Sequence, residues 1–291
     1  MIYVSSSCVR QHNIADVIRR LAGAGIRNIE LSGGTDYYDG IEREIGQLQR
    51  EYNLRYACHA YFPPPEEPFV VNLASCNDRI YKQSVGHYVN CIEMLKRLHC
   101  GVLSIHAGFM VEIGVEEVGN RLNGNIIYDE EKAYDRFCCA YEHIAGLCAD
   151  SGIALYLENN VLNAENYRQF AFQNHMMMTD YRSIMKMKEQ IEFNLLLDLG
   201  HLYVSANTLG LDYAKECEKL SAYVKWLHMS ENGGILDEHK PLQRDSAVLS
   251  EFRKIYTPCI NVTLETVGSM EEILNSVEMT EEIIDGKRRE L

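Results

Sequence analysis

Residues 134–158 read YDRFCCAYEHIAGLCADSGIALYLE, and this stretch joins one helix pattern to one strand pattern. Residues 134–149 have the apolar spacing of an amphipathic helix, which ends before Gly152. Residues 153–158 form a short apolar run that is typical of a buried strand. A helix that leads directly into a buried strand is the repeating unit of a parallel sheet.

This unit recurs along the whole chain. The predicted strands are residues 2–6, 28–31, 55–59, 102–106, 153–158, 194–198, 223–228 and 260–265. The predicted helices are residues 13–24, 41–52, 78–98, 134–149, 181–189, 211–221, 246–256 and 270–284. Eight alternations suit a closed (β/α)8 TIM barrel, an α/β fold that chains of about 250 residues commonly form as one domain. We therefore predict a single TIM-barrel domain over residues 1–291.

An open, doubly wound parallel sheet is the alternative fold. Such sheets usually bind a nucleotide through a glycine-rich turn after the first strand. The first predicted strand instead runs into Ser5-Ser6-Ser7-Cys8, which contains no glycine. This difference favours the barrel.

The charge balance limits the partners of the protein. The chain has 28 Lys and Arg against 42 Asp and Glu, a formal net charge of −14, which repels nucleic acids and anionic membranes unless bound cations cancel part of it. The 10 cysteines include no C-x-x-C pair, so we expect reduced packing residues. No secretion signal and no apolar run of membrane-spanning length is present. We expect a cytoplasmic protein that does not span a membrane.

Imidazoles and carboxylates stand where the predicted strands end, which is the end that carries the active site in TIM barrels. They are His59, His106, Glu158, Asp198, His201, His228, Asp237, His239 and Glu265. Such side chains bind hard or borderline divalent cations, and they outnumber the three or four ligands that one zinc ion needs. We therefore predict a site for one to three divalent ions, with Zn, Mn, Mg or Co as candidates.

Some of these residues also have ordinary structural interpretations. An isolated histidine is usually a packed or solvated side chain. Asp198 is as well placed to cap a helix as to bind a metal. Glu158 and Glu265 each end an apolar run, where a buried carboxylate without a partner is costly. A functional role is therefore favoured for these two glutamates.

Four further residues are candidates for contacts with substrate. Tyr61 and Phe62 begin a stiff aromatic loop, which is as consistent with a rigid turn as with one wall of a pocket. Lys240 and Arg244 are the basic residues nearest to the predicted rim in the sequence. Either could bind a phosphate, although such residues are more often solvated.

Eight short motifs, taken in order, resemble the xylose isomerase-like TIM-barrel superfamily, which includes endonuclease IV-type apurinic endonucleases and many sugar-phosphate isomerases and epimerases. The resemblance covers nearly the whole chain. The motifs are EL at 30–31, VVNLAS at 70–75 after His59, SIHAG at 104–108, LEN at 157–159, LDLGH at 197–201, LHMSEN at 227–232, DEHKPL at 237–242 and LET at 264–266.

The resemblance to endonuclease IV implies a phosphoester hydrolase with a trinuclear zinc cluster. It assigns the first ion to His59, His106 and Glu158. It assigns the second ion to Glu158, Asp198, His228 and Glu265, and the third to His201, Asp237 and His239.

The resemblance to isomerases and epimerases implies one divalent ion held by Glu158, Asp198, His228 and Glu265. In that case Glu158 and Glu265 move protons on opposite faces of an open-chain sugar through an enediolate. His201 then contacts the substrate. Four further residues shape the pocket or bind polar substituents: His59, His106, Asp237 and His239.

The loop after the second strand distinguishes these two functions. The endonucleases carry an arginine-bearing loop there that probes duplex DNA, whereas residues 32–39 read SGGTDYYD without a basic residue. Together with the net charge, this disfavours duplex DNA as a partner. We therefore expect an isomerase or epimerase of a small sugar, sugar phosphate or polyol derivative, with Glu158, Glu265 and His201 as its catalytic residues.

Two other functions stay open at this point. The hydrolase of the endonuclease IV type is the alternative enzyme. A barrel that binds metal or sugar as a sensor, without catalysis, is a third class. The resemblance also implies that the chain can associate into homo-oligomers.

Overall fold

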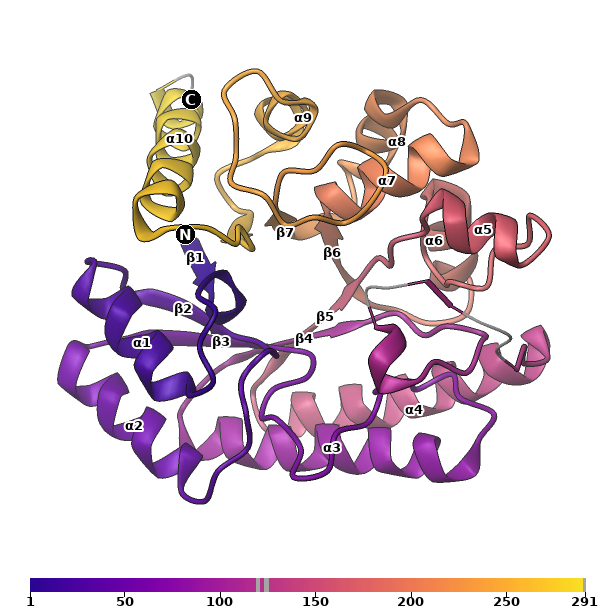
Figure 1. The fold of residues 1–291 in the computed structure, drawn as a ribbon, viewed down its shortest axis with the longest axis horizontal. Helices are drawn as coiled ribbons and strands as arrows, with labels where there is room; N and C mark the ends of the chain where they lie inside the picture. The colour runs from indigo at the N-terminus through magenta and orange to yellow at the C-terminus, as the bar shows by residue number, and fades with distance from the viewer. Residues whose placement is uncertain (119–120, 123–125, 290–291) are drawn as a thin grey trace.

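The computed structural model describes residues 1–118, 121–122 and 126–289. Eight parallel strands close into one barrel in chain order, with the helices around it (Figure 1). The strands are β1 Ile2–Ser5, β2 Asn28–Leu31, β3 Arg55–His59, β4 Val102–His106, β5 Ala154–Glu158, β6 Asn194–Asp198, β7 Val224–Met229 and β8 Asn261–Leu264. The predicted (β/α)8 barrel is confirmed, and each predicted strand lies within a residue or two of its observed bounds.

The helices form the outer layer of the barrel. They are α1 Ile14–Gly23, α2 Ile41–Tyr52, α3 Asp78–Arg97, α4 Glu130–Asp150, α5 Ala164–Gln169, α6 Tyr181–Lys188, α7 Leu199–Leu209, α8 Tyr213–Leu220, α9 Ala247–Ile255 and α10 Met270–Arg289. Two short 3-10 helices, η1 Ser6–Cys8 and η2 Val115–Glu117, complete the elements. None of the described helices combines the length and the apolar character that a membrane crossing requires.

Two of these helices, α5 and α7, were not predicted. Seven of the 11 residues of α7 are buried, so the helix lacks the alternating polar face by which an amphipathic helix is recognised. It also follows β6 without a loop, because Asp198 is both the last residue of the strand and the N-cap of the helix. A strand that runs directly into a buried helix gives no turn signal in the sequence.

Strand register brings the ends of the strands to one level. Neighbouring strands pair His106 with Glu158, Asp198 with His228, and Met229 with Leu264. Because alternate residues of a strand point to the same side, the residue two positions earlier lies one layer deeper. That deeper layer includes Ala57, Tyr156, Leu196 and Trp226, which pack together with Tyr3. This apolar layer lies directly beneath the polar mouth of the barrel.

Candidate metal centre

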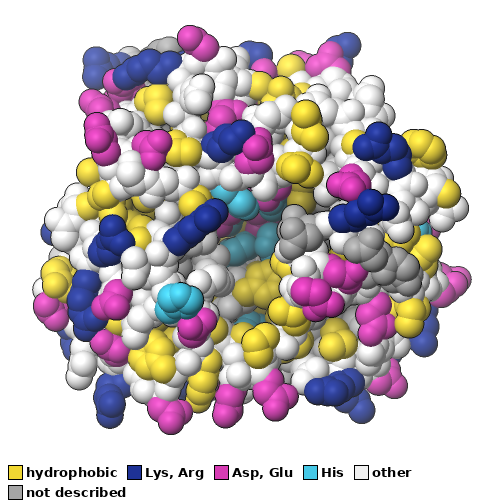
Figure 2. Space-filling model, in the orientation of Figure 1, with side chains coloured by type: hydrophobic (Ala, Val, Ile, Leu, Met, Phe, Trp, Pro, Cys, Tyr) yellow, Lys and Arg dark blue, Asp and Glu magenta, His cyan; other side chains and the backbone are white. Residues whose placement is uncertain are grey.

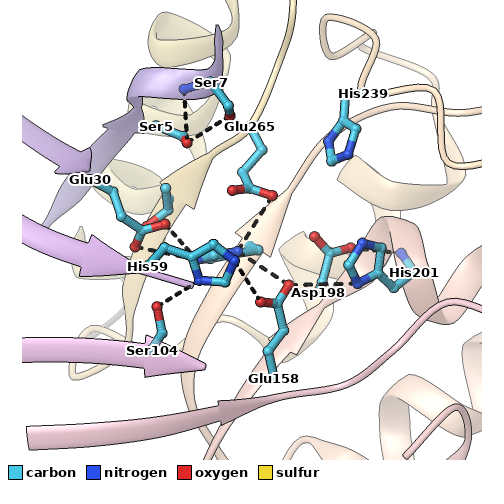
Figure 3. A network of polar contacts seen from close by, with 12 residues as sticks. Ser5, Ser7, Glu30, His59, Ser104, Glu158, Asp198, His201, His239 and Glu265 are labelled. Atoms are coloured by element: carbon cyan, nitrogen blue, oxygen red, sulfur yellow. Dashed lines mark hydrogen bonds and ion pairs between the residues drawn. The ribbon is translucent and has the colours of Figure 1, made fainter. Parts of the chain in front are cut away.

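The mouth of the barrel is a hollow in which histidine and acidic side chains gather (Figure 2). Five of these side chains come from strand ends. The last residues of β3, β4, β5 and β6 are His59, His106, Glu158 and Asp198, and His228 is the last residue but one of β7. Glu265 follows β8 directly, and His201 lies in the first turn of α7. Figure 3 shows that the side chains of this site point toward one another, among them His59, Glu158, Asp198, His201 and Glu265.

Glu158 lies at the centre of the cluster and is fully buried. Its Oε2 lies 3.2 Å from Nε2 of His59 and 3.4 Å from Nδ1 of His106. Its Oε1 lies 3.4 Å from Nδ1 of His228 and 3.5 Å from Nδ1 of His201. The two oxygens of one carboxylate therefore face two different sets of histidines.

Ligand atoms from the predicted residues converge in three groups. In each group, one ligand atom from every member lies within 4.8 Å of the others. The groups are His59, His106 and Glu158; Glu158, Asp198, His228 and Glu265; and His201, Asp237 and His239. The structure thus brings together all nine residues that the sequence pointed out, although their roles as ligands stay a prediction.

The loop between β7 and α9 completes the last group, because it carries Asp237 and His239. Oδ2 of Asp237 lies 3.2 Å from Nε2 of His201 and 2.9 Å from Nε2 of His239. The loop is tied down by paired backbone hydrogen bonds between Glu231 and Lys240 and by a bond from the Val267 amide to the His239 carbonyl oxygen. Asp237 and His239 are therefore held over the mouth by backbone contacts on both sides.

Several buried atoms of the cluster have no hydrogen-bond partner. They include both carboxylate oxygens of Glu158, Oδ2 of Asp198 and Nδ1 of His228. Oδ1 of Asp198 caps α7 by accepting a hydrogen bond of 2.6 Å from the His201 amide, so Asp198 fulfils the capping role and still presents its second oxygen. Unpartnered buried polar atoms are costly, and a divalent cation among carboxylate and imidazole ligands would satisfy them. The donor set therefore fits a metal.

The outer edges of the histidine rings are also fixed. Nδ1 of His59 lies 2.9 Å from the Ser104 hydroxyl, and Nδ1 of His201 lies 2.9 Å from the carbonyl oxygen of Asn159. Such partners on the second ring nitrogen set the tautomer and orientation of metal-binding histidines. The rings are thus oriented before any ion binds.

Glu30 is a member of this site that the sequence reasoning missed. It ends no apolar run, since Leu31 follows it in β2, although it stands in the first of the family-like motifs. Its Oε1 lies 3.0 Å from Nε2 of His228, and it forms a further group with His59 and His228. An acidic side chain in the middle of a four-residue buried strand was the available signal.

Burial and neighbouring charges shift the pKa values of several residues in this site. Burial lowers the pKa of His228 and of His239, but nearby carboxylates outweigh burial. The pKa of His228 is therefore raised well above its usual value, and the pKa of His239 is raised to about 9. Burial raises the pKa of Asp198 to about 6 and lowers that of His106 to about 4. The carboxylates therefore favour positive charge at this site, and a bound cation would supply that charge in place of the protons.

The predicted substrate contacts divide into two groups. The Tyr61 ring lies 6.0 Å from the His106 ring, at the edge of the cluster. Phe62 is only 1% exposed and packs in the main hydrophobic core, so its placement supports a packing role in place of the predicted pocket wall.

The two basic residues face carboxylates on the surface. Nζ of Lys240 lies 2.6 Å from Glu238, and the guanidinium of Arg244 forms a two-pronged ion pair with Glu282. Both side chains are more than half exposed. Neither placement supports the predicted contact with a substrate phosphate.

Comparison with known proteins agrees with this architecture. A family model described as xylose isomerase-like TIM barrel matches residues 18–283. An uncharacterized protein of Methanocaldococcus jannaschii is 22% identical over 208 residues, which are 72% of this chain and 68% of that protein.

Solved structures with the same fold include proteins named as sugar epimerases and a protein named as an AP endonuclease. A D-tagatose 3-epimerase-like protein aligns over 99% of this chain and 98% of its own, with a TM-score of 0.72 and 18% identity. An AP endonuclease, family 2, from Brucella melitensis aligns over 93% and 95%, with a TM-score of 0.60 and 14% identity. At these identities the likeness shows the fold alone. Since the family model spans most of the chain, this protein belongs to the xylose isomerase-like TIM-barrel family.

Proposed function

We propose that the protein is a divalent-metal-dependent hydrolase of small phosphoesters. The observation that carries this proposal is the position of Glu158, whose Oε2 faces His59 and His106 while its Oε1 faces His228 and His201. A carboxylate in that position bridges two ligand groups. Sites for two metal ions are typical of phosphatases and nucleases.

The sequence favoured an isomerase or epimerase over this hydrolase, and two features of the site are our reasons for placing the hydrolase first. An epimerase that uses Glu158 for proton transfer needs one of its oxygens turned toward the substrate. Here both oxygens are buried against imidazoles. The third group, with His201, Asp237 and His239, adds candidate ligands beyond the four that a site with one ion requires.

The residues would divide the work as follows. The three ligand groups would hold up to three ions, which when bound supply Lewis-acid chemistry and increase the acidity of water. Glu30, Ser104 and the Asn159 carbonyl oxygen hold the rings of His228, His59 and His201 in place. Tyr61, at the edge of the mouth beside His106, would form one wall of the pocket for the bound ester.

The surroundings of the mouth favour a small substrate. Residues 32–39 carry no basic side chain, and the chain has a net charge of −14. A polyanion such as duplex DNA is repelled by this charge, whereas a single phosphate group can be neutralised by the ions themselves.

The test combines metal counting with a substrate panel. We expect purified protein to carry more than one divalent ion per chain and to hydrolyse small phosphomonoesters or phosphodiesters, such as p-nitrophenyl esters, only when the ions are present. A protein with a single ion that hydrolyses none of these esters would contradict the proposal.

A sugar isomerase or epimerase remains the second candidate. The group of Glu158, Asp198, His228 and Glu265 supports it, because these four ligands suffice for the single ion of that chemistry. Sugar 3-epimerases are also prominent among the structures with this fold. Incorporation of solvent deuterium into a ketose would favour this candidate over hydrolysis, and an absence of exchange across a panel of ketoses would count against it.

A further inference from the structure

A second, separate cavity lies on the outer layer of the barrel between α1 and α10. Its volume is about 350 Å³. Its walls come from the segment after β1, from α1, and from the segment that joins β8 to α10. The lining residues used below are Arg10, Arg20, Gly268, Ser269, Met270 and Ile273. In Figure 1 this region lies where the start of α10 approaches β1.

The charge of this cavity is opposite to the charge of the whole protein. Arg10 and Arg20 both line it, and no Asp or Glu does. Within the described part of the chain, neither guanidinium makes a hydrogen bond or an ion pair, whereas the adjacent Arg19 pairs with Asp16 and Glu44. In a chain with 14 more acidic than basic residues, two arginines without carboxylate partners at one cavity are a concentrated positive site.

The start of α10 forms another wall of the cavity. Glu272, in the first turn of α10, is engaged in capping, because its Oε2 accepts hydrogen bonds of 2.8 Å from the amide and the hydroxyl of Ser269. The amide of the adjacent Met270 stands at the positive end of a 20-residue helix. Because Glu271 and Glu272 also lie in this first turn, the positive charge of the cavity comes from Arg10 and Arg20.

We propose that this cavity binds a phosphate group. Two guanidinium groups present planar forks of donors that match phosphate oxygens, and the cavity has room for more than the anion itself. Its wall is close to the metal centre along the chain, because Gly268 follows Glu265 by three residues, a span of roughly 10 Å at most. The bound phosphate is either free in solution or a distant group of a larger ligand.

The experiment measures the binding of inorganic phosphate to the metal-loaded protein by calorimetry at low salt. We expect the double variant Arg10→Gln/Arg20→Gln to weaken this binding at least tenfold, since both charged donors are lost. The control variant Arg19→Gln removes a charge from the same helix and is expected to bind phosphate as the wild type does. Unchanged binding in the double variant would overturn the proposal.

A further variant separates this site from the metal centre. Glu158→Gln disrupts the ligand groups at the mouth, and we expect it to retain the binding that depends on Arg10 and Arg20. Loss of all phosphate binding in Glu158→Gln would assign the anion to the metal centre and overturn the second site. If the ligand is a larger ester, the double variant raises the KM for esters with an additional phosphate but not for p-nitrophenyl phosphate. If the double variant changes the KM of neither ester, the ligand of this cavity is free phosphate.

Discussion

Oε1 of Glu30 lies 3.0 Å from Nε2 of His228, on the ring edge opposite to Nδ1, which faces Glu158 and Glu265. The Thr263 hydroxyl donates a hydrogen bond of 3.0 Å to Oε2 of Glu30, and the indole of Trp226 donates one of 2.9 Å to Thr263. All of these side chains are buried. The apolar layer under the mouth is thereby connected to one ligand of the proposed cluster.

We predict that Glu30→Gln weakens metal binding about 10- to 100-fold, the usual effect of losing an outer partner of a metal-binding histidine. The amide keeps the shape of the side chain but loses the charge that orients the ring and increases its basicity. Competition with a chelator measures the affinity directly. Glu271→Gln, an exposed site on α10, is the control for the change in charge.

The same measurement can refute this role. If Glu30→Gln binds metal as tightly as the wild type and only its melting temperature falls, then Glu30 stabilises the barrel and does not tune His228.

Glu158→Gln is predicted to reduce the number of bound ions by more than one, because Glu158 belongs to two of the ligand groups. Turnover should fall by more than the about 100-fold expected for an outer partner. Plasma emission on dialysed protein gives the count, and His143→Gln on the exposed face of α4 serves as control. The loss of a single ion would show that Glu158 does not bridge.

The barrel was predictable because its signals are local. Each strand is a short apolar run, and each amphipathic helix shows its own period, so the alternation is visible without tertiary information. The positions of several candidate ligands were predictable for the same reason, since these residues end those runs. His59, Glu158 and Asp198 are all the last residues of their strands.

The parts that sequence could not supply depend on contacts between distant segments. The contact between Glu30 and His228 joins β2 to β7, and these strands are separated in the barrel by β1 and β8. Phe62 is adjacent to Tyr61, yet only the structure shows that one of them enters the core. Arg244 was near the rim in sequence, but its partner Glu282 belongs to α10, and pairing across such a distance leaves no local pattern.

Two glycines offer a test of the packing outside the site. A Cβ at Gly108 would lie 2.5 Å from Cβ of Ala74 and 2.9 Å from the Phe137 ring, whereas a Cβ at Gly146, inside α4, meets nothing within 4 Å. We predict that Gly108→Ala destabilises the fold by about 1–3 kcal/mol through overpacking. Gly146→Ala should stabilise it by about 0.4–1 kcal/mol.

Urea unfolding of the metal-free protein measures both changes. The two changes in the free energy of unfolding should have opposite signs, because the substitution is the same and only its surroundings differ. Equal effects would mean that the loop after β4 does not approach α4 as closely as the structure has it.

Removal of the metal should reveal a characteristic pH dependence of stability. Burial lowers the pKa of His239, but its hydrogen bond and ion pair with Asp237 outweigh burial and raise the pKa to about 9. A group whose pKa is higher in the folded state stabilises that state when protonated. Its contribution is therefore complete below the unfolded pKa of about 6.5 and is lost as the pH rises through about 9. His201 and His228, whose pKa values are also raised, act in the same direction.

Metal-free protein should therefore melt at progressively lower temperature between pH 6.5 and 9, and His239→Gln should reduce this slope. Divalent cations should reverse the trend, because they bind the deprotonated imidazole and protons compete with them less as the pH rises. Thermal unfolding with chelator and with added metal, at three pH values in this window, separates the two effects. If the chelated protein keeps the same melting temperature from pH 6.5 to 9, the histidines are neutral without metal. The carboxylates of the mouth would then have to be balanced by another charge.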